Sequence, residues 1–423
     1  MTGAGESART DQGTVLRNIG PLATCAGSLP SGDAGEIRGA AVAWTGETIR
    51  WVGSERDLPA AMAEWPSLDA GGRLVIPGLV DAHTHLAFGG SRAEEFEARL
   101  RGVRYQDIAA AGGGILSTVR ATREATAEQL HARARAHLDF MVSRGVTTVE
   151  AKSGYGLDLD TEIRLLEVYA RLDRESAVRV VPTFLGAHTV PPEYSGRKDE
   201  YVRVVAEEML PEVARRGLAR FVDVFVEDGA FTPAHARTML AAGAAVGLRG
   251  KLHVDQLGPS GGAELAAELG ATSADHLEHI SSAGIDALAR AGVVAVSLPV
   301  ASLTLGQPPL PARALLDRGV PVAVATDFNP GSAPVPDLPL ALYLACVFQR
   351  MTPAESLRGG TIEGARALGL EDAVGSVEVG KRADLVVIEA ESVREWIYLF
   401  RSGPAYRTIV GGTTPGGPWL SAA

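Results

Sequence analysis

Two histidines separated by one residue, His83 and His85, end an apolar run that reads VIPGLVDAHTH over residues 75–85. Residues two positions apart on a strand point to the same face, so both imidazoles can bind one ion while Thr84 points away. A buried strand with polar ligands only at its carboxyl end is typical of a parallel sheet or barrel. The tripeptide alone also fits a chance pair in a loop or core, so the metal hypothesis depends on ligand-type residues elsewhere.

Seven further apolar runs follow, and segments with helical spacing, such as 161–168 and 263–269, lie between runs. The runs cover residues 146–150, 179–185, 221–226, 248–253, 272–276, 293–298 and 320–327. Eight such units predict an α/β fold, a (β/α)8 TIM barrel, whose active site lies at the carboxyl ends of its strands.

The residues at these strand ends are of types that bind metals or move protons. In chain order they are His83, His85, Tyr155, His188, Glu227, His253, His276 and Asp327. Three histidines with one carboxylate would bind zinc or iron and leave a position for water. The cation would lower the pKa of that water toward about 7, and Asp327 could take its proton. A hydrogen-bonded core position explains each histidine singly, but not the whole set.

Short strand-like runs also occur near both ends of the chain. They cover residues 39–44, 48–53, 375–388 and 407–410. Neither end has enough apolar area to stand alone, so we expect one small β domain built from residues 13–73 and 370–423. The barrel is then expected over residues 74–369, and residues 1–12 are expected to be a disordered tail.

The composition of the 423-residue chain indicates which kinds of partner and which cellular compartment to expect. A formal net charge of -11 argues against nucleic acid or an anionic membrane as the main partner. The longest apolar runs are broken by Gly, Pro or Arg, so no membrane helix is expected. Only Cys25 and Cys346 are present, and no secretory signal is visible, so we expect a cytoplasmic protein.

Five further motifs accompany the histidine run. They are FGGSRAEEF (88–96) with AGGGI (111–115), KSGYGL (152–157), FLGAH (184–188), KLHVDQ (251–256) and TDFNPGS (326–332). With the run PGLVDAHTH, the chain resembles the amidohydrolase superfamily, and the five motifs narrow the resemblance to the imidazolonepropionase family of histidine degradation. The β-rich ends fit the composite β-sandwich domain of that family.

The resemblance implies a metal-dependent hydrolase that opens the cyclic amide of 4-imidazolone-5-propanoate to N-formimidoyl-L-glutamate. The metal ligands that it implies are His83, His85, His253 and Asp327. The substrate contacts that it implies are Arg92, Tyr155, His188, Gln256, Asn329, Gly331 and Ser332. It also implies one zinc or iron ion and a homodimer, and no interface pattern in the sequence bears on the latter.

The chemistry of these side chains suits such roles. A propanoate calls for a charge-assisted partner, which Arg92 or Tyr155 near the mouth would provide. His188 could donate a hydrogen bond to the ring carbonyl and stabilise an oxyanion. His276 is expected to support the water or Asp327 from behind. The residues after the eighth strand offer amide, backbone and hydroxyl groups, and they also read as a turn.

Two residues, Gln256 and Glu227, bear on alternative functions of the site. Gln256 stands where related deaminases have a proton-shuttling glutamate, and it cannot ionise, so a deaminase of that type is disfavoured. The leaving nitrogen must then take its proton from another group, for which we expect Asp327, with His188 or His276 second. A second ion on Glu227, His188 and His276 is a further alternative. Other readings are a different cyclic amidohydrolase or heterocycle deaminase, or a barrel without activity that serves as a scaffold.

Overall fold

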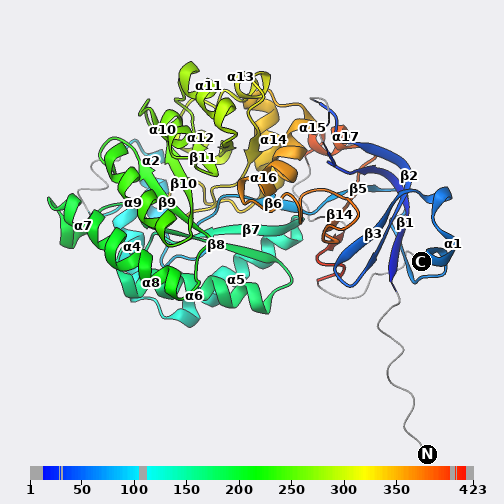
Figure 1. Cartoon of the computed structure of the whole chain (residues 1–423), viewed down its shortest axis with the longest axis horizontal. Coiled ribbons are helices and arrows are strands. Elements are labelled where there is room, and N and C mark those ends of the chain that lie inside the picture. The colour runs from blue at the N-terminus through cyan, green and yellow to red at the C-terminus, as the bar shows by residue number, and fades with distance from the viewer. Residues whose placement is uncertain are drawn as a thin grey trace, which may run out of the picture.

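The computed structural model describes residues 13–27, 29, 32–103, 112–400, 405 and 407–415. Residues 1–12, for which a disordered tail was expected, and residues 416–423 of the expected small domain lie outside this part of the chain. Within it, the chain forms two separate sheets, a large one surrounded by helices and a small one beside it (Figure 1).

The large sheet has eight parallel strands that follow one another in chain order, as the apolar runs predict. The strands are β6 (Leu79–Asp81), β7 (Val146–Lys152), β8 (Arg179–Ala187), β9 (Phe221–Val226), β10 (Arg249–Val254), β11 (Ser273–His276), β12 (Val294–Ser297) and β13 (Val322–Val324). Each of the seven later runs overlaps one strand of this sheet, including the short polar run at 272–276, and the first run contributes β6. The predicted α/β barrel is confirmed.

The ring closes between the first and last strands at the residues that carry the site. The His85 N–H donates to the Phe328 carbonyl (2.8 Å), and the Asp327 N–H donates to the His83 carbonyl (3.0 Å). Barrel closure therefore fixes the relative positions of two histidines and a carboxylate through their own backbone.

Asp81 joins the same two strand ends just below this seam. Its carboxylate accepts from the Thr326 N–H (3.0 Å) and from the Thr326 hydroxyl (2.7 Å). Burial raises the pKa of Asp81 to about 7, and the two bonds from Thr326 oppose that rise.

The small sheet combines both ends of the chain, in the order β15-β14-β5-β1-β2-β3 with β4 beside β1. Its strands are β1 (Thr14–Ala23), β2 (Glu36–Thr45), β3 (Thr48–Ser54), β4 (Ser67–Asp69), β5 (Leu74–Pro77), β14 (Leu385–Ile388) and β15 (Arg407–Ile409). Side chains such as Leu16, Trp44 and Leu385 form an apolar cluster apart from the barrel core. The sheet therefore has its own core, as expected for a domain built from two chain ends.

The run at 75–85, expected to be one barrel strand, is in fact two strands. Residues 74–77 form β5 of the small sheet, where Val75 pairs with Val387 of β14. The barrel begins only at Leu79, after Gly78. A Cβ on Gly78 would lie 2.2 Å from the Thr147 hydroxyl oxygen, so only glycine fits where the chain passes between the sheets.

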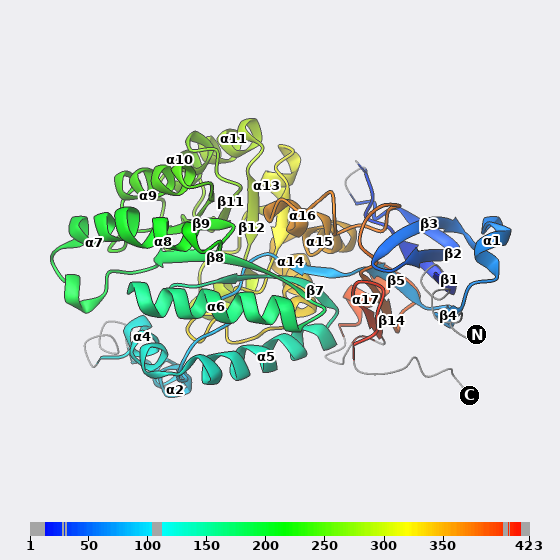
Figure 2. The same ribbon diagram turned by 60° about the horizontal axis from the view of Figure 1, so that its bottom comes forward.

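Helices lie outside the ring, and α5 and α6 run along β7 and β8 (Figure 2). The longer ones are α2 (Ala93–Leu100), α4 (Ile115–Glu124), α5 (Ala127–Ser143), α6 (Leu159–Glu175), α9 (Pro233–Ala245), α11 (Ser282–Ala291) and α14 (Leu338–Gln349). The shorter ones are α1 (Ala60–Ala63), α7 (Lys198–Val204), α8 (Leu210–Arg215), α10 (Gly262–Glu268), α12 (Pro299–Leu305), α13 (Ala312–Asp317), α15 (Pro353–Gly359), α16 (Ile362–Ala367) and α17 (Val393–Tyr398). No helix in the described part of the chain is long and apolar enough to cross a membrane.

Candidate active site

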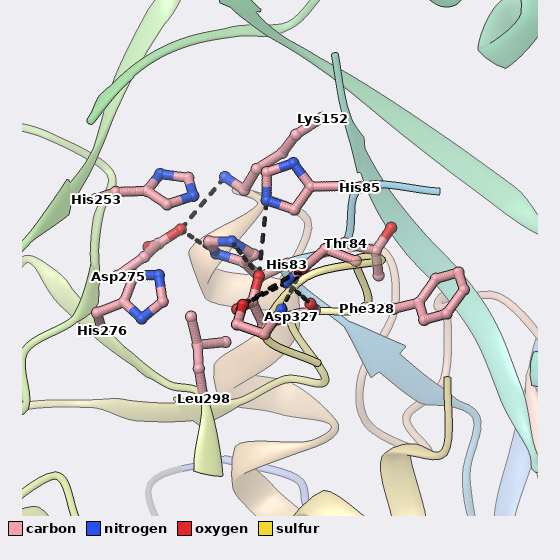
Figure 3. Close-up of polar contacts among 12 residues, drawn as sticks. His83, Thr84, His85, Lys152, His253, Asp275, His276, Leu298, Asp327 and Phe328 are labelled. Atoms are coloured by element: carbon pink, nitrogen blue, oxygen red, sulfur yellow. Dashed lines mark hydrogen bonds and ion pairs between the residues drawn. The ribbon is translucent and has the colours of Figure 1, made fainter. Parts of the chain in front are cut away.

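Three of the predicted metal ligands meet at the seam of the barrel. The Asp327 carboxylate oxygen Oδ1 lies 3.3 Å from His83 Nε2 and 3.6 Å from His85 Nε2 (Figure 3). All three side chains are buried, and the alternation along the chain after β6 turns both histidines inward. The convergence expected from the sequence is therefore present between the first and last strands.

His253, at the end of β10, and His276, at the end of β11, approach from the opposite wall. The His253 ring centroid lies 4.5 Å from that of His83, and the His276 centroid lies 5.4 Å from that of His253. Of the four groups of three ligand-type atoms in the described part of the chain, two together contain the expected ligands, namely His83 with His85 and Asp327, and His83 with His253 and His276. His83 belongs to both groups, so the four expected ligands lie around it, although no single group holds all four.

Two imidazole nitrogens in this cluster lack a partner that a bound cation would provide. His83 Nε2 and His253 Nε2 are buried and have no hydrogen-bond partner among the described residues. A buried polar atom without a partner costs about 1–3 kcal/mol. A divalent ion held by imidazole and carboxylate groups would remove that cost, and this donor set suits zinc or iron.

Two carboxylates lie next to these histidines. His83 Nδ1 lies 2.7 Å from Asp275 Oδ2, and His253 Nδ1 lies 3.0 Å from Asp223 Oδ2. Because a carboxylate accepts, His83 Nδ1 carries the proton, and the Nε2 lone pair of His83 is left to face the cluster. His253 Nδ1 lies near Asp223 without a well-aligned hydrogen bond. Figure 3 shows the Asp275 carboxylate in contact with both His83 and Lys152.

Lys152 holds both carboxylates at once. Its ammonium Nζ lies 2.7 Å from Asp223 Oδ2 and 3.3 Å from Asp275 Oδ2. Below it, Glu150 accepts from Lys152 (3.2 Å) and from Lys251 (2.8 Å). All five side chains are fully buried, so the barrel interior below the histidines is a charged network rather than an apolar core.

The charges in this network determine one another's protonation. Burial alone would raise the pKa of Asp275, but Lys251 and Lys152 outweigh it and hold that pKa well below its usual range. Asp223 shows the same direction, because His253 and Lys152 oppose its burial. Burial would lower the pKa of Lys152, yet the surrounding carboxylates raise it. Asp223, Asp275 and Lys152 are therefore ionised near neutral pH.

This charged network was not expected from the sequence, although the sequence carries a signal for it. Charged residues stand two positions before the ligand histidines, in Asp81-x-His83 and Lys251-x-His253, and Glu150 stands two before Lys152. Positions two apart share the inward face of a barrel strand, so charge at them predicts polar contacts beneath the ligands.

A cavity of about 260 Å³ opens above the cluster. All the predicted substrate contacts line it, namely Arg92, Tyr155, His188, Gln256, Asn329, Gly331 and Ser332. The side nearest the cluster is lined by His85, His253, His276 and Asp327. The apolar lining residues are Ile115, Phe225, Leu257 and Leu305. Arg99 also lines the cavity, and it was not among the residues singled out from the sequence.

His188 stacks on His85, with ring centroids 5.0 Å apart and an interplanar angle of 17°. Its Nδ1 lies 3.1 Å from the Gly154 carbonyl and therefore carries the proton. Burial, with the nearby His253, lowers the pKa of His188 to about 3, so the ring is neutral. In that state Nε2 is an acceptor, and the donation to a substrate carbonyl expected from the sequence requires a protonated ring.

Polar loops hold the other lining residues. Asn329 Oδ1 accepts from the backbone N–H groups of Gly331 and Ser332, each at 2.8 Å, so the turn expected there is formed. Glu227 accepts from the backbone N–H of Gln256 and of Leu257, each at 3.0 Å. Glu227 belongs to no group of three ligand atoms among the described residues, so the alternative of a second ion on it gains no support.

The four histidines expected to be surface or packing residues lie away from the cluster. His131 pairs with Glu175, His137 with the Leu86 carbonyl, His235 with Asp199 and His279 with Gln307.

A buried histidine and carboxylate cluster at the carboxyl ends of an eight-stranded barrel is the arrangement of a hydrolytic metal site. The model of the amidohydrolase family matches residues 74–414, and the chain belongs to that family. Its sequence is 48% identical over 408 residues to the imidazolonepropionase of Geobacillus kaustophilus (strain HTA426), with 94% of this chain and 96% of the relative covered. It is 45% identical to the imidazolonepropionase of Porphyromonas gingivalis (strain ATCC BAA-308 / W83), over 94% of this chain and 96% of the relative.

Solved structures share the fold at lower identity. A triazine hydrolase variant superposes with a TM-score of 0.73 at 17% identity, covering 96% of this chain and 94% of that chain. An adenosine deaminase from Xanthomonas campestris with bound zinc gives a TM-score of 0.68 at 20% identity, covering 95% of this chain and 92% of that chain. These likenesses establish the barrel architecture.

Proposed function

We propose that this protein hydrolyses the cyclic amide of 4-imidazolone-5-propanoate to N-formimidoyl-L-glutamate, the third step of histidine degradation. The observation that carries the proposal is the meeting of His83, His85 and Asp327 beneath a cavity lined by every predicted substrate contact. The imidazolonepropionases that cover nearly the whole chain at 45–48% identity support this particular substrate.

We assign one metal ion, zinc or iron, to His83, His85, His253 and Asp327. The unpartnered Nε2 atoms of His83 and His253 support this set, since a bound ion would be the partner that each lacks. Such an ion, when bound, would lower the pKa of water and so supply hydroxide as the nucleophile that attacks an amide near neutral pH. Three histidines with one carboxylate accept both metals, and availability decides between them in the cell.

Asp327 is the residue that we assign to proton transfer. Its carboxylate is buried beside His83 and His85 and faces the cavity. In the reaction, the carbonyl carbon gains the oxygen of water and loses the ring nitrogen, while one proton moves from the water to that nitrogen. Asp327 would accept this proton and deliver it. His276 lines the same cavity and would support the attacking water or Asp327.

The remaining lining residues would bind the rest of the substrate. Arg92 and Tyr155 are assigned to the propanoate end, and Asn329, Gly331 and Ser332 to the polar part of the ring. His188 and Gln256 are placed against the ring itself. Since His188 Nε2 is an acceptor in the neutral ring, we assign it to an N–H group of the substrate.

Gln256 favours amide opening over deamination. Its side chain lines the cavity, and it has no ionisable group with which to shuttle protons to a ring nitrogen. The other readings, a different cyclic amidohydrolase or a heterocycle deaminase, require another proton donor in that place.

We further propose a cytoplasmic homodimer whose ligand is a small molecule, without nucleic acid or membrane as a partner. Support comes from the net charge of -11, the two free cysteines and the resemblance to the family. Gel filtration with light scattering measures the oligomeric state.

The test is to follow the loss of imidazolone absorbance with purified protein before and after chelation. We expect turnover that disappears with the metal and returns when one equivalent of zinc or iron is added. Full turnover of metal-free protein contradicts the mechanism. Absence of turnover with either metal, together with release of ammonia from an aminated heterocycle, would replace the proposal by a deaminase.

A further inference from the structure

One face of helix α2 borders the cavity and carries alternating charges. Arg92 precedes the helix, Glu95 lies three residues later and Arg99 seven residues later. This spacing places all three side chains on one face of a helix. Arg92 and Arg99 are the arginines that line the cavity, and no lysine lines it in the described part of the chain.

Arg92, on which the sequence places recognition of the propanoate, already has a carboxylate partner. Its Nε lies 2.9 Å and its Nη2 2.8 Å from Glu95 Oε2, in a half-buried ion pair. The other Glu95 oxygen, Oε1, accepts from the Gly114 N–H (2.9 Å) and from the Ser117 hydroxyl (3.0 Å). One forked edge of Arg92 is therefore occupied, and its charge is balanced before a substrate enters.

Arg99 is different. Among the described residues, its one polar contact is the donation from Nη2 to the Gly331 carbonyl at 3.1 Å, and none of their carboxylates pairs with it. The three charges on this face of α2 therefore sum to one positive charge. That charge is partly buried at a cavity wall, where it interacts more strongly with an anion than a fully solvated one would.

We propose that Arg99 supplies the net positive charge at the carboxylate end of the substrate, beside Arg92, whose own charge Glu95 balances. The inference rests on the proposed function and makes the site selective for monoanionic over neutral cyclic amides. The apolar lining residues Ile115 and Leu305 suit the methylene chain between the ring and the carboxylate.

Two substrates and three variants test this assignment. The substrates are 4-imidazolone-5-propanoate and its neutral propanamide, and the variants are Arg99→Met, Arg99→Lys and Arg101→Met. Arg101 follows α2, is exposed and pairs with Glu97, so it is a control outside the cavity. We expect Arg99→Met to raise KM for the propanoate roughly 10- to 100-fold, as for loss of a charged hydrogen bond, with a smaller change in kcat.

The same variant should leave kcat/KM for the propanamide within about twofold of wild type. Arg99→Lys should recover part of the affinity for the propanoate, because it keeps the charge without the fork. Arg101→Met should match wild type on both substrates. An Arg99→Met protein with an unchanged KM for the propanoate overturns the inference. So does an equal loss on both substrates, which would show that Arg99 acts only through the Gly331 loop.

Failure of the proposed function has a separate signature. A wild-type protein that hydrolyses neither substrate ends that proposal, and calorimetric binding of the inert anion imidazole-4-propanoate then decides the role of Arg99. Weaker binding to Arg99→Met than to Arg101→Met supports the assignment. Equal binding, or no binding to wild type, refutes it.

Discussion

Asp275 accepts a hydrogen bond from His83 across the interior of the barrel, at 2.7 Å between Oδ2 and Nδ1. The two residues come from β11 and from the end of β6, which are not neighbours in the sheet. The bond fixes the tautomer of His83, so that its Nε2 lone pair faces the cluster. It also links the ligand to Lys152, which lies 3.3 Å from the same oxygen.

Replacing Asp275 by Asn should weaken cation binding. The amide keeps the shape of the side chain but loses the charge that makes His83 a stronger ligand. We expect the affinity for zinc to fall roughly 10- to 100-fold, as for other residues that support metal ligands. Competition with a chromogenic chelator measures this affinity. Asp286→Asn, which alters an exposed pair with Arg318, is the control, and equal affinities of the two variants would contradict the role of Asp275.

Replacing Lys152 by Met should instead make the stability of the protein depend more strongly on a bound cation. Without the ammonium, Asp223 and Asp275 are buried 2.7 and 3.3 Å from a lost partner. We expect the metal-free protein to lose about 3–5 kcal/mol of unfolding free energy, the usual cost of an unpaired buried charge.

Zinc should recover more stability in Lys152→Met than in wild type, because its charge then compensates both carboxylates. Urea unfolding with and without zinc measures the two stabilities. Lys198→Met is the control, since among the described residues Lys198 bonds to backbone carbonyls and to no carboxylate. A metal-free Lys152→Met protein as stable as this control is the result that speaks against the prediction.

The sequence predicts the barrel well, because its strands are continuous apolar runs and their carboxyl ends must lie together. Even the polar run at 272–276 is identified by its place in the β/α alternation. The boundary at β5 could not be read in this way. Whether residues 74–77 pair within the barrel or outside it depends on β14, about three hundred residues later, where Val387 pairs with Val75. Local periodicity carries no information on such a partner.

Every predicted site residue except His83 lines one cavity, yet their separate roles could not be ranked from the sequence. Arg92 or Tyr155 was expected to bind the propanoate, and Glu95, three residues after Arg92 on a helix, pairs with that arginine. His188 was expected to donate a hydrogen bond. The Gly154 carbonyl that fixes its tautomer comes from another strand end, so the donor and acceptor roles depend on tertiary structure.

Two replacements of His188 test the roles of its two ring nitrogens separately. An asparagine amide stands near the position of Nδ1 and can still donate to the Gly154 carbonyl, whereas a glutamine amide reaches the position of Nε2. If Nε2 contacts the substrate, His188→Gln should retain about tenfold more kcat/KM than His188→Asn, the worth of one hydrogen bond. Steady-state kinetics on the imidazolone measures this ratio. An Asn variant that is the more active of the two shows that the bond to Gly154 matters more.

Glu162 shapes the loop that carries Tyr155. This fully buried carboxylate accepts from the backbone N–H groups of Gly154 (3.0 Å), Gly156 (2.7 Å) and Leu157 (2.8 Å). Burial raises its pKa above the usual 4.5, in spite of these bonds. The folded protein therefore keeps the proton at pH values where the unfolded chain has lost it.

The pH dependence of stability should reveal this proton. Because the folded pKa of Glu162 is raised, its contribution to unfolding free energy is largest below pH 4.5 and declines as the pH rises through the folded pKa. Glu162→Gln cannot ionise, so the wild type should lose stability relative to the variant as the pH rises above 4.5 through the range of the folded pKa. Urea unfolding of both proteins across that range measures the difference. A difference that instead grows in favour of the wild type would show that the three N–H groups outweigh burial and lower the pKa.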